Sequence, residues 1–194
     1  MPPTRPALLV VPLIVGASPA LAHTRTELGG LASGLLHPIT GLDHVVAMVA
    51  VGLWGGILRA PAIWLLPVVF PLVMALGGAA AVAGVPLPGV EAGIALSGVV
   101  LGLMVVLAAR PPLWAAVALV GAFAVFHGHA HGAELPQSAV PAVYAVGFVI
   151  ATGLLHFAGI AVGQIGRWRV GRAAVRVAGA AIALAGGAFL TGVA

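Results

Sequence analysis

Residues 61–83 read PAIWLLPVVFPLVMALGGAAAVA, and none of their side chains is ionisable. A helix needs about 20 consecutive apolar residues to cross the roughly 30 Å hydrocarbon core of a bilayer. The stretch is long enough for one crossing. It therefore predicts a transmembrane α-helix in the middle of the first half of the chain.

Similar apolar stretches lie on both sides of this one, and six are present in all. The connections are short, so neighbouring helices are antiparallel. Pro61, Pro88 and Pro112 stand at or just before helix starts, where the missing N–H costs little. The sequence therefore predicts an all-α fold, a polytopic membrane helix bundle with six transmembrane helices. The expected spans are 37–58, 61–83, 88–109, 113–131, 138–163 and 172–193.

The composition excludes an ordinary water-soluble domain. The chain has 194 residues, 62% hydrophobic and only 6% charged, whereas a soluble domain has about 25% charged residues. The net charge is +4, but the basic residues do not gather on a polar face among stacking aromatics, so nucleic acid is not an expected partner. Without cysteine, any bound metal must be held by nitrogen, oxygen or thioether sulfur.

The first 22 residues resemble a cleavable signal peptide. Arg5 gives a positive start, residues 7–15 an apolar core, and residues 20–22 (ALA) a cleavage site. Cleavage leaves His23 as the mature N-terminus and residues 23–194 as a six-helix transmembrane domain. The alternative is an uncleaved seventh helix, although the apolar run is short and contains Pro12.

Arginine placement supports one orientation. Cytoplasmic loops of inner-membrane proteins carry an excess of basic residues. With the mature N-terminus outside, the first, third and fifth loops are cytoplasmic and the second and fourth carry no arginine. Both mature termini are then expected in the periplasm of a bacterium. The arginines of the cytoplasmic side are Arg59, Arg110, Arg167, Arg169, Arg172 and Arg176, and within five residues of one of them lie Trp54, Trp64, Trp114 and Trp168, as expected of interfacial anchors.

Glycines spaced G-x-x-x-G predict close helix packing, because association in lipid relies on small residues. The pairs are Gly52 and Gly56, Gly98 and Gly102, Gly128 and Gly132, and Gly159 and Gly163.

Polar residues within the spans point to a function, since an Asp in mid-span costs about 3 kcal/mol on insertion scales. On one expected helix, His37 and His44 are seven residues apart and share a face, with Asp43 beside them and Met48 one turn below His44. Imidazole and carboxylate together suit Ni, Co, Zn and Mn. The alternative is a buried ion pair that holds helices in register.

The segment HGHAHGAE, residues 127–134, offers a second group of ligands. If the helix persists, His127, His131 and Glu134 form one stripe and His129 points away. If the glycines unwind it, all three imidazoles can converge. By the expected topology this group lies at the periplasmic mouth, level with His37.

Three further residues are weaker candidates. His156 lies inside the fifth span, where Thr152 is placed to hydrogen-bond its ring and where a permeating ion needs a second stop. After cleavage His23 has an imidazole and a free α-amine, which together can chelate a metal. Glu91 begins the third span near the same mouth, although an acidic residue at a helix N-terminus is often only a favourable charge.

The motif H-P-x-x-G-x-D-H-x-x-A-M-x-x-V-G-x-W, residues 37–54, resembles the signature of the HupE/UreJ family of nickel and cobalt permeases. Residues 127–134 and the segment ATGLLH, residues 151–156, are also similar to that family, and the resemblance covers the mature chain. It implies uptake of Ni²⁺ or Co²⁺ for hydrogenase, urease or cobalamin pathways, with the histidines and aspartate of the first motif required for transport.

Transport by a secondary permease or facilitator is therefore the expected function, since no G-x-x-x-x-G-K-[ST] loop is present to couple ATP. The expected partners are the transported metal ion and the lipid bilayer; no prosthetic group and no enzymatic activity are expected. The alternatives are an accessory factor for urease or hydrogenase maturation, a membrane metalloenzyme, and a bis-histidine haem protein using His44 and His156. The sequence does not decide whether the chain forms a homo-oligomer.

Overall fold

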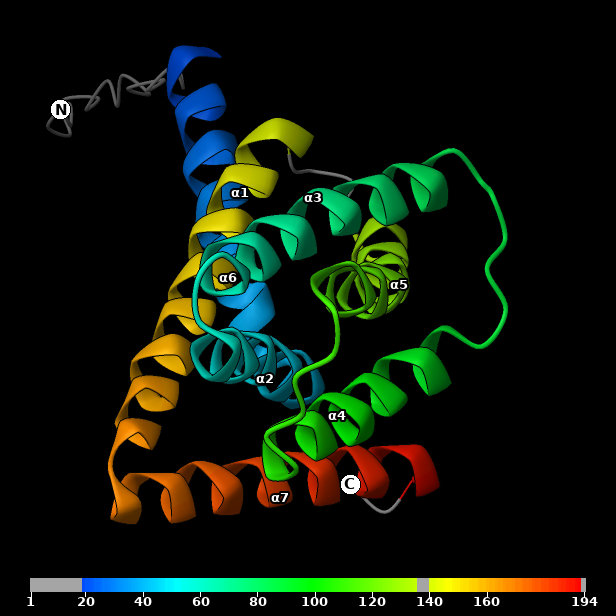
Figure 1. The fold of residues 1–194 in the computed structure, drawn as a ribbon. Coiled ribbons are helices and arrows are strands. Elements are labelled where there is room, and N and C mark those ends of the chain that lie inside the picture. The colour runs from blue at the N-terminus through cyan, green and yellow to red at the C-terminus, as the bar shows by residue number, and fades with distance from the viewer. Residues whose placement is uncertain (1–18, 136–139, 193–194) are drawn as a thin grey trace, which may run out of the picture.

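The computed structural model describes residues 19–135 and 140–192, which form seven α-helices and one short 3-10 helix without any strand (Figure 1). The all-α prediction is confirmed. In chain order, the elements are α1 (Pro19–Thr40), α2 (Leu42–Leu58), α3 (Ala62–Val82), α4 (Val90–Val106), α5 (Leu113–Ala133), α6 (Pro141–Gln164), η1 (Ile165–Arg167) and α7 (Arg169–Thr191).

Five of the six expected spans correspond to single helices with ends within a few residues of the prediction. Four of these are long and apolar enough to cross a membrane, as expected of a membrane protein. They are α3, α5, α6 together with η1, and α7. Helix α4 is apolar but has only 17 residues, about 25 Å at 1.5 Å per residue. The number of six spans therefore stays a prediction.

The expected first span, residues 37–58, is not one helix, and this prediction was wrong. Helix α1 ends at Thr40, Gly41 is extended (φ −86°, ψ 104°), and α2 starts at Leu42 with a bend of 80° between the helices. Pro38 weakens the end of α1 because it lacks an N–H. The Thr40 hydroxyl donates to the carbonyl oxygen of His37, 3.0 Å away, which is one of the last four carbonyls of α1 and is not bonded within a continuing helix.

Helix α2 lies in the middle of the fold, where it packs against α1, α3, α4, α6 and α7 (Figure 1). Ten of its 17 residues are buried. The glycine spacing explains the closest contact: a Cβ on Gly52 would overlap the carbonyl oxygen of His156, and one on Gly159 would overlap that of Val49. Glycines likewise bring α4 against α7 and α3 against α5. Small residues therefore set the packing, as predicted.

The antiparallel helices give the protein two chemically different ends. At one, here called the histidine end, α2 begins beside Asp43 and α5 finishes beside Glu134. At the other, here called the arginine end, α2 finishes before Arg59 and α5 begins after Arg110. Asp43 and Glu134 thus lie at one end and Arg59 and Arg110 at the other, in agreement with the grouping of these arginines expected from the sequence.

Three of the four tryptophans fit the interfacial prediction and one does not. Trp64, Trp114 and Trp168 are 64%, 74% and 67% exposed at the arginine end. Trp54 is instead buried, and its Nε1–H donates to the carbonyl oxygen of Ala109 at 2.9 Å. It ties α2 to the segment after α4 and is not an anchor in the lipid interface.

Residues 1–18 of the expected signal peptide lie outside the described residues. Residues 19–22, with the expected cleavage site, form the start of α1.

Candidate metal centre

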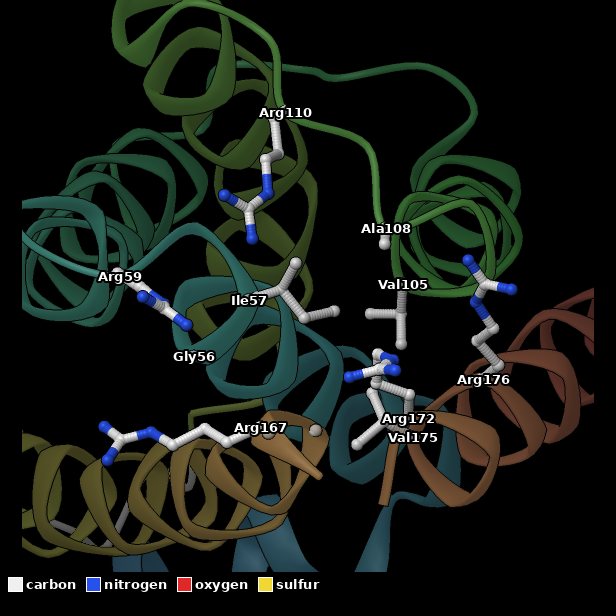
Figure 2. Close-up of a pocket in the computed structure, with 12 residues that line it drawn as sticks. Gly56, Ile57, Arg59, Val105, Ala108, Arg110, Arg167, Arg172, Val175 and Arg176 are labelled. Atoms are coloured by element: carbon white, nitrogen blue, oxygen red, sulfur yellow. The ribbon is translucent and has the colours of Figure 1, made fainter. Parts of the chain in front are cut away.

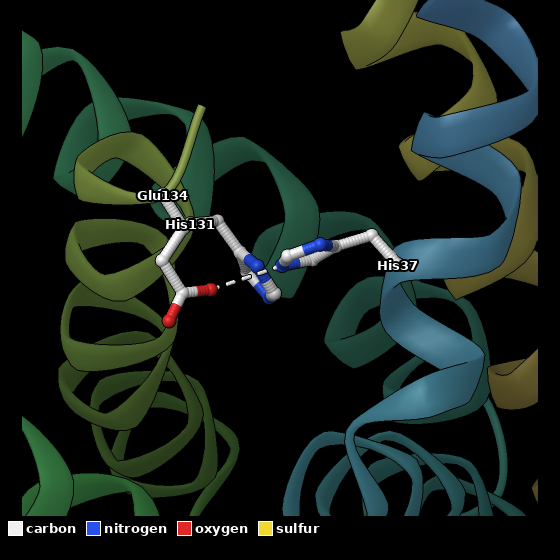
Figure 3. A group of neighbouring side chains, drawn as sticks. All are labelled: His37, His131 and Glu134. Carbon is white, nitrogen blue, oxygen red and sulfur yellow. Dashed lines mark hydrogen bonds and ion pairs between the residues drawn. The ribbon is translucent and has the colours of Figure 1, made fainter. Parts of the chain in front are cut away.

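The outer part of the site is formed by the end of α1 and the end of α5. His37 Nε2 lies 3.1 Å from a carboxylate oxygen of Glu134, which caps α5. One ligand atom each from His37, His131 and Glu134 lie within 4.8 Å of one another, so the three can hold one metal ion (Figure 3). His37 and Glu134 are partly exposed, whereas His131 is buried. This group is therefore reachable from outside the bundle.

The first turn of α2 presents a second imidazole with a fixed orientation. The Asp43 carboxylate accepts hydrogen bonds from the backbone N–H of His44 at 2.8 Å and from its ring Nδ1–H at 2.9 Å. The ring nitrogen Nε2 then carries the lone pair, and it is buried without a hydrogen-bond partner. A carboxylate behind a histidine in this way fixes the ring and increases its basicity as a metal ligand.

A third imidazole, His127 on α5, is fixed by a hydroxyl on α4. The Ser97 hydroxyl donates to the carbonyl oxygen of Ile94 at 2.6 Å, so its oxygen accepts from His127 Nε2–H at 2.8 Å. His127 Nδ1 then carries the lone pair, and it has no protein partner. Both Ser97 and His127 are completely buried.

The four rings form a continuous row. The ring centroids of His37 and His131 are 4.9 Å apart, those of His131 and His44 are 4.2 Å apart, and those of His44 and His127 are 4.7 Å apart. The histidines come from the consecutive helices α1 and α2 and from α5, which is distant from them in sequence. The structure thus brings together His37, Asp43, His44, His127, His131 and Glu134, all predicted from the sequence.

His156 lies beyond this row. Its ring, buried on α6, packs edge-on against Phe70 at a centroid distance of 5.5 Å, and Phe70 in turn lies 5.4 Å from His127. The expected hydrogen bond from Thr152 is absent, since the hydroxyl of Thr152 and both ring nitrogens of His156 have no partner. His156 is therefore separated from the row by one aromatic side chain.

The other candidates stand apart. Helix α5 persists to Ala133, so His129 points away from the row and bonds the carbonyl oxygen of Val85 at 2.8 Å. Glu91 lines the same mouth as His37 and Asp43. His23 lies in α1, but its side chain is outside the described part of the structure.

Sequence reasoning did not find Ser97 or Phe70. A hydroxyl in an otherwise apolar helix was a signal that could have found Ser97. Phe70 carried no such signal, because a phenylalanine in an apolar stretch is ordinary.

Comparison with known proteins identifies the family of the chain. The model described as HupE / UreJ protein matches residues 11–189, which include every residue of the row. The chain belongs to the HupE/UreJ family. A HupE/UreJ relative, "Protein HupE" from Rhizobium leguminosarum bv. viciae, is 44% identical over 178 residues, covering 91% of this chain and 93% of that protein. No solved structure matches.

Proposed function

We propose that this protein is an inner-membrane permease that takes up Ni²⁺ or Co²⁺ through the histidine row. The association of the HupE/UreJ family with nickel and cobalt uptake supports the proposal. The histidine end then faces the periplasm and the arginine end the cytoplasm, in agreement with the distribution of basic residues in inner-membrane proteins.

One observation carries the proposal: the buried polar atoms without protein partners are mostly imidazole nitrogens. Among the described residues, six of eight such side-chain atoms belong to His44, His127, His131 and His156. A buried polar group without a hydrogen bond costs about 1–3 kcal/mol. The ring nitrogen that carries the lone pair in each of these histidines can recover that cost when it binds a passing cation.

The donors favour a borderline transition metal. Neutral imidazole and carboxylate suit Ni²⁺, Co²⁺ and Zn²⁺, and the chain has no thiolate to select a softer ion. Asp43 and Glu134 supply negative charge that offsets the charge of the ion as it loses water. Nothing in this donor set separates nickel from cobalt.

The geometry suggests an order of events. His37, His131 and Glu134 capture the ion at the exposed mouth, His44 and His127 receive it, and His156 is the next stop beyond Phe70. Several moderate sites in series suit conduction, because one tight site would retain the ion. Inward movement of a divalent cation gains about 4.6 kcal/mol per 100 mV of membrane potential, twice the single-charge value.

Uptake of radioactive nickel by cells without their own nickel uptake tests the proposal. His131→Ala should abolish most uptake, whereas His129→Ala, which removes a histidine two residues away and outside the row, should retain it. Cobalt and zinc serve as competitors. Equal uptake by both variants at equal protein amounts would contradict the proposed path.

Three further measurements on the purified protein, namely nickel binding in detergent, nickel accumulation in sealed vesicles and an absorbance spectrum, separate transport from metal binding alone. An accessory factor or a membrane metalloenzyme would bind nickel in detergent without accumulating it in sealed vesicles. A haem protein would show a haem absorbance spectrum. A porphyrin bound to His156 would need the space that Phe70 fills against that ring.

A further inference from the structure

A second site of a different kind lies at the arginine end. One pocket between the ends of α2, α4, α6 and α7 is lined by five guanidinium-bearing residues, and it has no acidic residue in its wall (Figure 2). Its arginines are Arg59, Arg110, Arg167, Arg172 and Arg176.

None of these arginines has an ionic partner within the described part of the protein. The described ion pairs are those of His37 with Glu134 and of Asp43 with His44, both at the histidine end. Glu91 lines that same end. Several like charges around one pocket repel one another. Among the described side chains no carboxylate is paired with these arginines, so the pocket is suited to an anion from outside the chain.

Guanidinium groups favour phosphate as that counterion. Their planar, forked donors bind phosphate oxygens in pairs, and charge-assisted bonds of this kind are the strong ones. In Figure 2, Arg110 extends from the segment before α5 toward Ile57, while Arg172 approaches from α7. Guanidiniums from separate segments thus line one pocket.

The surroundings of the pocket favour a lipid phosphate over a soluble one. Ile57, Val105 and Val175 form apolar parts of its wall. The exposed tryptophans at this end mark the membrane interface, so the pocket lies at headgroup depth. Basic pockets between transmembrane helices on the cytoplasmic side bind anionic headgroups. We propose that this pocket binds the phosphate of an anionic phospholipid.

Lipid binding to the purified full-length protein in neutral detergent tests this. Native mass spectrometry measures the binding of phosphatidylglycerol, phosphatidylcholine and inorganic phosphate. Of these three ligands, phosphatidylglycerol should bind the wild-type protein most tightly. The double variant Arg110→Gln/Arg172→Gln should weaken its binding about 25-fold, at roughly fivefold for each arginine. Arg169→Gln is the matched control, because Arg169 begins α7 but does not line the pocket.

Three results would overturn the proposal. Equal weakening by the control and the double variant would mean that the arginines act only as diffuse positive charge. Equal binding of phosphatidylcholine would mean that the apolar wall alone holds the lipid. Displacement of phosphatidylglycerol by inorganic phosphate would mean a site for a free anion. If the double variant does not fold, as judged by circular dichroism and gel filtration, the single variants give the same comparison.

Discussion

Ser97→Ala is the most specific perturbation of the histidine row, because the only ring that Ser97 hydrogen-bonds is that of His127, and it does so at the nitrogen that does not carry the lone pair. Its oxygen accepts from His127 Nε2–H, and this leaves Nδ1 of that ring as the free lone pair. Alanine removes the acceptor and leaves a buried N–H without a partner. His127 then loses the bias toward the tautomer that presents a lone pair to the row.

The size of the effect follows from this hydrogen bond. A buried bond of this kind contributes about 0.5–1.5 kcal/mol, which changes the tautomer ratio by about two- to twelvefold. Substituting a group that orients a metal-binding histidine typically costs about 10- to 100-fold in affinity. We expect the nickel concentration at half-maximal uptake to rise about tenfold, with little change in the amount of folded protein.

Initial rates of radioactive nickel uptake over a range of concentrations measure this change. Ser33→Ala is the control, since that hydroxyl bonds only the carbonyl oxygen of Gly30 on α1. Immunoblots of the membrane fraction correct for protein amount. If the Ser97→Ala and wild-type curves coincide at equal protein amount, the tautomer argument is wrong.

Three other predictions address the deep site, the packing and protonation. His156→Ala should lower the maximal rate of nickel uptake more than the half-saturating concentration, because His156 lies beyond the capture residues; an unchanged maximal rate would exclude it from the path. Gly52→Ala should lower the melting temperature in detergent, since overpacking costs about 1–3 kcal/mol. Gly153→Ala is the control and should not lower it, because there is open space around the added Cβ. Equal melting temperatures of the two variants would contradict the packing account. Acidifying the medium from about pH 7.5 to about 5.5 should reduce uptake, because only unprotonated imidazole binds metal; uptake that stays flat would count against imidazole capture.

The helices could be predicted from the sequence because lipid imposes a simple rule. Each apolar stretch of sufficient length must form a helix, and the observed ends of α3 and α5 lie within two residues of those expected. The glycine spacing also indicated which helices pack closely. These features depend on local composition, so the sequence alone is enough for them.

The orientation of His129 could not be predicted, because it depended on whether two glycines unwind the end of α5. A Cβ on Gly128 would overlap the carbonyl oxygen of Met74, and one on Gly132 would overlap that of Gly78. The glycines are thus used for close packing against α3. That contact keeps the helix intact and turns His129 away from the row.

The bend at Gly41 was the other feature that the sequence analysis did not predict, and it lies within the centre. In one continuous helix, His37 and His44 would be about 10.5 Å apart along the axis, at 1.5 Å per residue. Here the two rings lie on separate helices on either side of the bend, and their centroids lie 4.9 and 4.2 Å from that of His131. Non-helical backbone within a membrane is tolerated where it lines a cavity, and Gly41 lines the mouth. At this break the end of α1 and the start of α2 meet, and each places one histidine against His131.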